Sequence, residues 1–545
     1  MAKTGQERPR QAAYRLPGRL IFWTALGALL LAAAGLILAG QQASAQAGSQ
    51  VYLPLIANYK PLQTSHAKYF SVYEGSKTCT PCHKQEAAEV HGSAHYQWKG
   101  DTPSVPNLGT AGKLGGINDF CGYPDINWIG LMTNLDGKTV DGGCSTCHTG
   151  LGLKPDPSAS AEQLENIDCL ICHSETYRRK VQEENGRFRF VPAPEKMTVS
   201  LLEGITDITL PNRAACLSCH VYAGGGSNNK RGDLEAAHIN PPSASFDVHM
   251  ASKAIGGAGL GCTDCHTTRD HRIAGRGVDL RETDLAQPVR CTNCHPAQPH
   301  DSAELNRHTA RVDCAACHIP FFAKITSTDM LRDFRSAEVD QARRLYEPSI
   351  ERRQAVTPEY RFWDGRSYIY EFGTPAAAGS SGRVLMAGPL GDINTTGAKI
   401  YPFKHHQAVQ AVDPVTQFII PLKMGLLFQT GNVDQAVRQG AAAVGWGLPQ
   451  GYDFIQTERY MGIFHEVSPA DEALACADCH EGSRMDFAAL GYGVKTSRNG
   501  RPLCASCHED KSDEWKTNFF QRVHDKHVRD ERAACTECHT YTPAP

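Results

Sequence analysis

The pattern Cys-x-x-Cys-His occurs ten times in this chain of 545 residues. Two thiols at this spacing can form thioether bonds to one porphyrin, and the histidine that follows can bind its iron, as in c-type haem attachment. The cysteines are Cys79, Cys82, Cys144, Cys147, Cys169, Cys172, Cys216, Cys219, Cys262, Cys265, Cys291, Cys294, Cys314, Cys317, Cys476, Cys479, Cys504, Cys507, Cys535 and Cys538. The histidines are His83, His148, His173, His220, His266, His295, His318, His480, His508 and His539. The sequence therefore predicts ten covalently bound haem c groups.

Paired cysteines also build zinc sites and disulfide frameworks, and both fit this chain less well. A structural zinc site needs four ligands, and a disulfide framework gives no reason for a histidine after every second cysteine. The motifs use all but one of the 21 cysteines, which leaves Cys121. In INDFCGYPDINW this thiol is either a small buried side chain or a thiol beside an open haem that can exchange with sulfur substrates.

A six-coordinate haem needs a second strong ligand from outside the motif. Ten of the 23 histidines lie in motifs, and 13 remain: His66, His91, His95, His238, His249, His271, His300, His308, His405, His406, His465, His524 and His527. This supply would cover every iron. Counting alone therefore leaves open whether any haem has a free face.

The stretch CLSCHVYAGGGSNNKRG (216–232) contains a lysine that allows two interpretations. A lysine in a glycine-rich loop is usually exposed and solvated. To bind iron, Lys230 would have to be neutral, which requires burial and a metal charge that depresses its pKa. Glycines at 224–226 would let the backbone approach a porphyrin closely. The sequence is compatible with either role.

The spacing of the motifs divides the chain into segments that position these residues. We expect a signal peptide or membrane anchor at 1–45, a tether at 46–75 and a seven-haem body with the substrate site at 76–320. A haem-free insert at 321–470 would supply distal ligands, with loops that cover a cleft or make subunit contacts. A three-haem tail follows at 471–545.

The expected fold is mainly α with much irregular loop, a multihaem cytochrome c fold organised around a stack of ten haems. Short helices are predicted at 84–98 and 303–318, and the clearest longer helix at 329–346. Residues 188–201 and 360–373 are predicted to be extended, the latter as a hairpin that turns at Asp364-Gly365. The 50 glycines and 31 prolines interrupt most other periodic stretches.

The first residues indicate export. A basic segment precedes an uncharged apolar run at 20–40, and Ala43-Ser44-Ala45 offers a cleavage site, so the segment is either a signal peptide or an uncleaved anchor. Either way the rest of the chain would be extracytoplasmic, in the periplasm or at the outer face of the cytoplasmic membrane. The formal net charge of −3 disfavours a nucleic-acid partner.

Several runs of sequence together resemble one family. They are CTPCHKQEAAEVHGSAHYQW, NDFC, IDCLICH, CLSCHVYAGGGSNNKRGDL, FDVHM, LNRHTARVDCAACHIP and CADCHEGSRMDFAALGY, in that order. Over residues 75–495 the chain resembles the octahaem tetrathionate reductase family of c-type cytochromes, which is related in haem arrangement to hydroxylamine oxidoreductase and pentahaem nitrite reductase.

The resemblance implies one substrate-binding haem, on the motif of Cys144 and Cys147, whose iron takes a lysine that matches Lys230. The active-site cysteine of the family matches Cys121. Whether Lys230 would lie opposite His148 or replace it stays open. The family has an acidic residue three positions before the lysine, where this chain has Ser227. A hydroxyl cannot act as a carboxylate acid or base, which puts substrate choice or proton delivery in doubt.

The resemblance also implies the distal ligands of eight haems, which are Lys230, His95, His249, His271, His300, His308, His465 and one of His405 and His406. The motifs at Cys504 and Cys535 extend beyond the family pattern, and His524 and His527 lie between them.

The expected function is that of a decahaem oxidoreductase. It would reduce a small inorganic substrate (tetrathionate, nitrite or hydroxylamine) at one lysine-ligated haem, which a chain of bis-histidine haems supplies with electrons. A redox partner protein or a quinol-linked donor would deliver the electrons, and an uncleaved anchor would hold the protein at the membrane. The alternative is an electron conduit in which all ten haems are six-coordinate.

Overall fold

The structure is a computed structural model that describes residues 64–120, 122–275, 288–480, 484–494, 522, 525–533 and 535–540. The predicted export segment and most of the tether lie outside these ranges, as do Cys121, Cys504, Cys507, His508 and His524. The side chains of His480, Cys535 and His539 also lie outside the description. No helix within the described ranges is long and apolar enough to cross a membrane.

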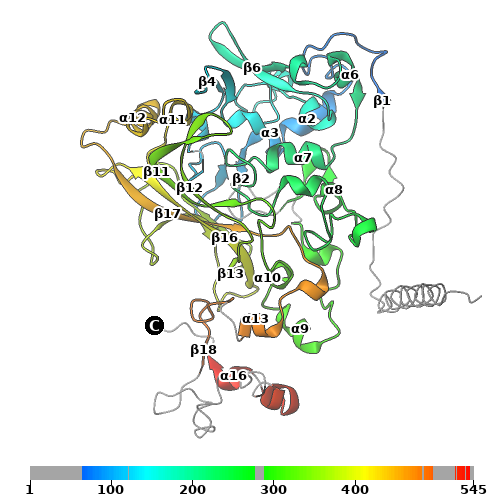
Figure 1. The fold of residues 1–545 in the computed structure, drawn as a ribbon, viewed down its shortest axis with the longest axis vertical. Helices are drawn as coiled ribbons and strands as arrows, with labels where there is room; N and C mark the ends of the chain where they lie inside the picture. The colour runs from blue at the N-terminus through cyan, green and yellow to red at the C-terminus, as the bar shows by residue number, and fades with distance from the viewer. Residues whose placement is uncertain are drawn as a thin grey trace, which may run out of the picture. The chain divides into compact units, whose positions relative to one another are not determined.

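Short helices carry eight of the nine described cysteine motifs, and the first motif, at 79–83, lies in turns. Figure 1 shows how these short helices are arranged. The α-helices are α2 (Lys84–His91), α3 (Ala94–Gln97), α4 (Ala161–Glu165), α5 (Leu170–His173), α6 (Leu201–Thr206), α7 (Arg213–His220), α8 (Cys262–Cys265), α9 (Ala303–His308), α10 (Cys314–His318), α11 (Met424–Thr430), α12 (Val433–Ala443), α13 (Cys476–His480) and α16 (Cys535–Cys538). The 3-10 helices are η1 (Pro124–Ile126), η2 (Cys144–Cys147), η3 (Pro194–Lys196), η4 (Ala236–Ile239), η5 (Lys253–Ile255), η6 (Cys291–Asn293) and η7 (Ala470–Glu472), and η10 (Asp525–Asp530) is a π-helix.

One helical turn brings residues three apart to the same side of the backbone, which suits two thiols that serve one porphyrin. Side-chain caps fix where two of these turns begin. Asn212 accepts a hydrogen bond from the backbone of Ala215 at the start of α7, and Asp313 accepts one from Ala315 at the start of α10. The helices predicted at 84–98 and 303–318 are confirmed as α2 with α3 and α9 with α10.

A seven-stranded sheet occupies residues 328–462. Its strands are β11 (Thr328–Asp340), β12 (Leu345–Arg353), β13 (Glu359–Trp363), β14 (Ser367–Ile369), β15 (Val384–Pro389), β16 (Lys399–Val412) and β17 (Asp453–Gly462). The order is β12-β11-β16-β17-β15-β14, and β13 pairs with β16 beside β11. This sheet lies on one side of Figure 1, next to α11 and α12.

Strand pairs account for the remaining sheets. These pairs are β1 (Thr64–Ser65) with β8 (Asp207–Ile208), β2 (Lys99–Asp101) with β3 (Thr110–Gly112), β4 (Gly130–Thr133) with β5 (Thr139–Gly142), β6 (Arg179–Glu184) with β7 (Arg187–Pro192), β9 (Thr268–Arg269) with β10 (Arg272–Ile273), and β18 (Gly493–Val494) with β19 (His539–Thr540). The extended prediction for 188–201 holds for its first residues, which lie in β7.

Two predictions about the insert are wrong. Residues 329–346 form β11 and the start of β12 instead of a helix, because long-range pairing with β12 and β16 overrides local helix propensity. The stretch 360–373 is extended, but its two strands do not pair with each other. Strand β13 pairs with β16, and β14 pairs with β15. The turn at Gly365 therefore joins two strands that have different pairing partners in the sheet.

The expectation of a mainly α fold is also wrong for the insert. The longest elements are strands, β16 with 14 residues and β11 with 13, whereas the longest described helix, α12, has 11. A large apolar cluster lies where α11 and α12 pack on the sheet, around Phe334, Leu427 and Val437. Each such side chain contributes about 1.5–3 kcal/mol when it is buried.

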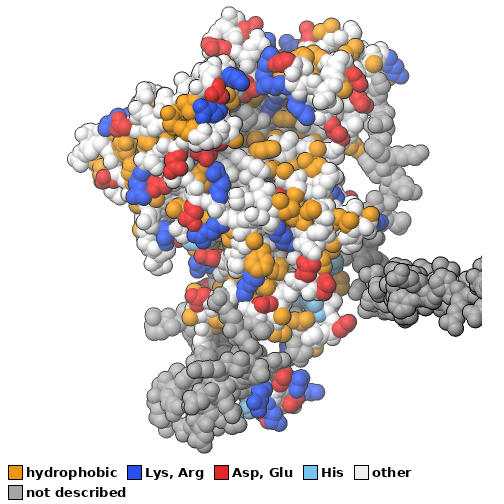
Figure 2. All heavy atoms as spheres, viewed as in Figure 1, with side chains coloured by type: hydrophobic (Ala, Val, Ile, Leu, Met, Phe, Trp, Pro, Cys, Tyr) orange, Lys and Arg blue, Asp and Glu red, His pale blue; other side chains and the backbone are white. Residues whose placement is uncertain are grey.

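Charged side chains of both signs alternate over the face drawn in Figure 2, with apolar side chains exposed between them. Exposed large apolar residues include Tyr222, Ile255, Phe321 and Ile325, which come from loops near the motif-bearing helices.

Candidate functional site

Six pairs of histidine rings face each other with centroids 6.1–6.3 Å apart. The pairs are His83 with His66, His173 with His271, His220 with His95, His266 with His465, His295 with His249, and His318 with His300. Each pair joins one motif histidine to a histidine from elsewhere in the chain. Two imidazoles on opposite sides of one iron, each bonded at about 2 Å, would have centroids about 6 Å apart. The spacing therefore fits a haem iron between the rings.

His148 differs from the six other motif histidines whose side chains the structure describes. Those six are half-buried or exposed, whereas His148 is fully buried. Its Nε2 lies 2.6 Å from the carbonyl oxygen of Tyr96, and the rings of Tyr96, Trp98 and Trp128 surround it with centroids 5.0–5.3 Å away. Because a carbonyl only accepts, Nε2 must carry the proton, so its lone pair is not available to a metal.

Burial also keeps His148 neutral. It lowers the pKa of His148 to about 4, because the charged ring would lose its hydration inside the aromatic cage. Gly150 allows this packing, since a Cβ there would lie 2.7 Å from the His148 ring. The structure thus directs the histidine of the second motif into the protein.

The motifs lie side by side in a defined order. Among the described cysteines, thiols of different motifs are in contact between Cys79 and Cys169, Cys147 and Cys219, Cys216 and Cys262, and Cys291 and Cys314. Cys172 lies near Cys216, Cys265 near Cys294, and Cys317 near Cys479. The motifs that begin at 79, 169, 216, 262, 291, 314 and 476 therefore form a line, and the motif of Cys144 lies beside that of Cys216.

The glycine loop buries Lys230. Helix α7 leads directly into this loop, where Gly224 and Gly225 have φ of +88° and +92° and the backbone of Lys230 donates to Ala223 at 3.1 Å. Lys230 is 6 % exposed, and its Nζ lies 5.9 Å from the ring centroid of Phe120. A Cβ at Gly224 would lie 3.0 Å from the Cβ of Lys230, so a glycine is required here. The structure excludes the solvated role for Lys230.

Phe120 immediately precedes Cys121 in the sequence. Cys121 lies outside the described residues, whereas the ring of Phe120 lies beside Lys230 of the glycine loop. Besides Lys230, the ring of Phe120 has Arg332 at 5.3 Å and Lys404 at 5.6 Å from its centroid, and the ring of His406 stacks on it at 4.0 Å. Phe120 is therefore the centre of a cluster of basic side chains.

Three of these side chains, Lys404, His406 and Arg332, come from one face of the large sheet, as does Arg459. Lys404 and His406 are two residues apart on β16. Arg459 on β17 pairs with His406, and Arg332 on β11 pairs with Ala408 on β16. Since side chains two apart on a strand share a face, all four point to the same side of the sheet. That side packs against the segment at 119–120 and the glycine loop.

Lys404 and Arg332 hold the glycine loop and the segment at 119–120 in place through hydrogen bonds. Lys404 Nζ donates to the carbonyl oxygens of Asn229 (2.7 Å) and Lys230 (3.1 Å) and to the hydroxyl of Thr328 (2.6 Å). Arg332 donates to the carbonyl oxygens of Phe120 and Gly224. Burial lowers the pKa of Lys404 to about 7, although Asp329 acts in the opposite direction. The loops of the insert were expected to cover a cleft or contact another subunit. Side chains of its sheet hold the glycine loop and the segment at 119–120 in position.

Asp119 completes the cluster. Its carboxylate is fully buried and accepts from Arg459 Nε at 2.5 Å and from His406 Nδ1 at 2.6 Å. Burial alone would raise the pKa of Asp119, but Arg459 and His406 outweigh it and hold this pKa well below its usual range. Burial lowers the pKa of His406 to about 4, so the ring is neutral and leaves Nε2 as an acceptor.

The contacts of His405 and His406, of which one was expected to be a distal ligand, differ from those of the six facing pairs. Both ring nitrogens of His405 are bonded to carboxylates, Glu359 at 2.9 Å and Glu458 at 3.0 Å, while its ring stacks on Tyr460. His406 is fully buried on Phe120, whereas the six non-motif rings of the facing pairs are half-buried. The structure instead brings His66 to the first motif, a histidine that precedes this motif by 13 residues. Only that proximity in sequence could have indicated it.

The surroundings of His405 predict a pH-dependent stability. Burial acts to lower the pKa of His405, but Glu359 and Glu458 outweigh it and raise this pKa above its ordinary value. The added stability is therefore fully present below pH of about 6.5 and is lost as the pH rises through the folded-state pKa. We expect His405→Gln to cost about 1.5–3 kcal/mol near pH 6 and less near pH 9, measured by thermal unfolding. Lys180→Gln, at an exposed pair with Glu195, is the control. An equal loss for His405→Gln at both pH values would contradict this expectation.

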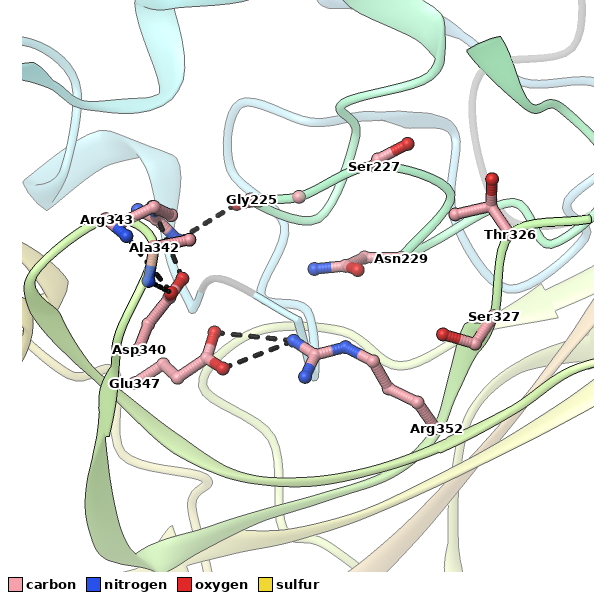
Figure 3. A pocket seen from close by; sticks show the side chains of 11 residues that line it. Gly225, Ser227, Asn229, Thr326, Ser327, Asp340, Ala342, Arg343, Glu347 and Arg352 are labelled. Atoms are coloured by element: carbon pink, nitrogen blue, oxygen red, sulfur yellow. Dashed lines mark hydrogen bonds and ion pairs between the residues drawn. The ribbon is translucent and has the colours of Figure 1, made fainter. Parts of the chain in front are cut away.

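The remaining predicted residues are placed as follows. His308 ends α9. His527 bonds to Glu531 at 2.7 Å. Ser227 lines a cavity of about 320 Å³ on the outside of the glycine loop, between Arg343 and Thr326 (Figure 3). Because Arg343 and Arg352 in this cavity bond to Asp340 and Glu347, their charges are compensated. Lys230 is not among the residues that line this cavity.

Comparison with known proteins agrees with this arrangement. A family described as "Cytochrome c bacterial" matches residues 346–483. An uncharacterized protein of Archaeoglobus fulgidus is 35 % identical over 246 residues, which cover 39 % of this chain and 79 % of the relative. The crystal structure of the octahaem cytochrome c of Shewanella oneidensis superposes with a TM-score of 0.62 at 30 % identity, covering 76 % of this chain and 92 % of that one.

The cysteine motifs, the facing histidines and these comparisons define a multihaem c-type cytochrome with haem c as its cofactor. Within that class, the chain belongs to the octahaem cytochrome c family. Its sequence has ten motifs, whereas the Shewanella protein is an octahaem cytochrome.

Proposed function

We propose that this protein is a decahaem reductase of small sulfur or nitrogen compounds, with tetrathionate, nitrite and hydroxylamine as the substrate class. The reaction takes place at the haem of Cys144 and Cys147, and Lys230 is its iron ligand. The observation that carries this proposal is the burial of His148. Among the seven motifs whose histidine side chains are described, the motif of His148 alone lacks a facing histidine pair. Cys147 lies beside Cys219, whose helix leads into the loop of Lys230.

The residues of the chain have separate tasks in this proposal. When bound, the haem supplies electrons and a Lewis-acidic iron. Lys404 and Arg332 hold the two loops at a fixed distance from each other, and Phe120 excludes water from the side of Lys230. His406, held by Asp119, stacks on Phe120 and fixes the position of its ring. Tetrathionate would take up two electrons, and its central S–S bond would break to give two thiosulfate ions.

The six facing histidine pairs support a relay in the same proposal. Both sides of each iron would be occupied, so these haems would carry electrons without binding substrate. A redox partner protein or a quinol-linked donor would load this relay outside the cytoplasm, and the two C-terminal haems lengthen it. The second candidate function, an electron conduit alone, is favoured by the same pairs and differs only in the haem of Cys144.

Low-temperature electron paramagnetic resonance of the oxidised protein distinguishes the two functions. Mass spectrometry first counts the haems per chain, for which we expect ten. One haem in ten should then give a signal that changes on addition of nitrite or, separately, hydroxylamine, while the low-spin signals of the histidine pairs stay constant. If all signals are low-spin and insensitive to both compounds, the protein is a conduit and the reductase proposal is wrong.

A further inference from the structure

Two of the facing pairs have a carboxylate bonded to the histidine that comes from outside the motif. His465 Nδ1 lies 3.0 Å from Asp233 Oδ2, and His271 Nδ1 lies 2.8 Å from Glu89 Oε2. Asp233 is fully buried and also accepts from the backbone nitrogens of Phe464 and His465. These contacts fix both rings with Nε2 facing the motif histidine across the pair.

The motif histidines of the same pairs have weaker acceptors. His266 Nδ1 lies 2.9 Å from the carbonyl oxygen of Ala274, and His173 Nδ1 lies 2.9 Å from that of Thr209. An ionised carboxylate withdraws the proton of Nδ1 more strongly than a carbonyl and makes the opposite nitrogen a more basic ligand. A more basic axial ligand stabilises the oxidised iron and so lowers its reduction potential.

Both carboxylates have further donors that favour a negative charge. Asp233 accepts from Arg231 as well as from the two backbone nitrogens, and Glu89 accepts from Gln85. Hydrogen bonds donated to a carboxylate favour its ionised form. The negative charge needed to tune each ligand is therefore present.

The two tuned pairs flank a third. The motifs of His173 and His266 adjoin the motif of His220, through Cys172 near Cys216 and through the contact between Cys216 and Cys262. The motif of His220 in turn adjoins Cys147. The cationic side chains of Lys113 and Arg231 lie near His220. Cations near a haem favour its reduced form, because reduction removes a positive charge from the iron.

We propose that Asp233 and Glu89 are positioning residues that lower the reduction potentials of the haems on Cys262 and Cys169, so that electrons collect on the haem of Cys216 beside the haem of Cys144. This inference rests on the ligand pairs and the relay proposed above. One electron from the donor enters the haem of Cys216 through a flanking haem, and one leaves to the haem of Cys144. No bond is made or broken and no proton moves in this transfer.

The test is a redox titration of the full-length holoprotein followed by electron paramagnetic resonance. Asp233→Asn should move the reduction potential of one low-spin component upward by at least about 59 mV. For one electron, this shift is a tenfold change in the ratio of oxidised to reduced haem at a given potential. Glu89→Gln should move a different component. Glu162→Gln, at an exposed carboxylate in the first turn of α4, removes the same charge without a histidine contact and should move none.

Two further variants keep the test decisive. Asp233→Glu retains the charge and should restore the potential of the wild type; if it shifts like Asp233→Asn, the charge is not the cause and the proposal is wrong. The component lost in His95→Ala identifies the haem of Cys216, which should titrate above the two tuned haems. A titration without these shifts but with all low-spin signals intact would overturn this inference alone. Missing low-spin signals in the wild type would instead contradict the ligand pairs.

Discussion

Replacing Lys230 with alanine is expected to lower the rate of nitrite or tetrathionate reduction at least about a hundredfold, because changes even to residues behind a metal ligand cost 10–100-fold. The structure supports this expectation in two ways. Lys230 is 6 % exposed in a loop held by Lys404, and the histidine of the adjoining motif is bonded to Tyr96. The loss of Lys230 would therefore leave one iron without either ligand.

The spectrum should change together with the rate. In Lys230→Ala the substrate-sensitive signal should alter or vanish while the low-spin signals of the histidine pairs remain, which shows that the variant is folded and loaded with haem. Lys253→Ala, at an exposed lysine in another loop, should leave both rate and spectrum unchanged. A Lys230→Ala protein with the signal and the rate of the wild type would show that Lys230 only fills space beside Phe120.

Replacing Asp119 with alanine is expected to destabilise the protein by about 3–5 kcal/mol, since it leaves the buried cation of Arg459 without its partner. Arg459 has a side chain that is 3 % exposed, and Asp119 is fully buried between it and His406. The measurement is the midpoint of thermal unfolding. Asp434→Ala, which breaks the exposed pair with Arg438, should change this midpoint little.

The pH dependence provides a second check on Asp119. Because the folded-state pKa of this carboxyl is held well below its usual value, its stabilising effect is fully present above the unfolded value of about 3.9 and is lost only as the pH falls through the folded value. The difference between wild type and Asp119→Ala should therefore stay constant from about pH 8 to pH 5. A difference that shrinks in this range would mean that Asp119 is not held by Arg459 and His406.

The local pattern of the chain determined the haem chemistry. Each attachment motif lies within five consecutive residues, so the type and spacing of its side chains are visible without a fold. The class of multihaem c-type cytochromes and the short helices at most of the motifs could be predicted for the same reason. The large sheet could not, because its strands are stabilised by partners far away in the sequence, and residues 329–346 have enough local helix propensity to mislead.

The tertiary structure alone decided which histidines face each other and which do not. His271 and His465 face motif histidines to which no local pattern connects them, while His405 lies between Glu359 and Glu458 on the sheet. The most consequential case is His148, which has the same motif as the other histidines and yet donates to Tyr96 inside an aromatic cage. The physical reason is that a motif specifies the atoms that can bind iron, whereas burial and competing hydrogen bonds decide whether those atoms are available to it.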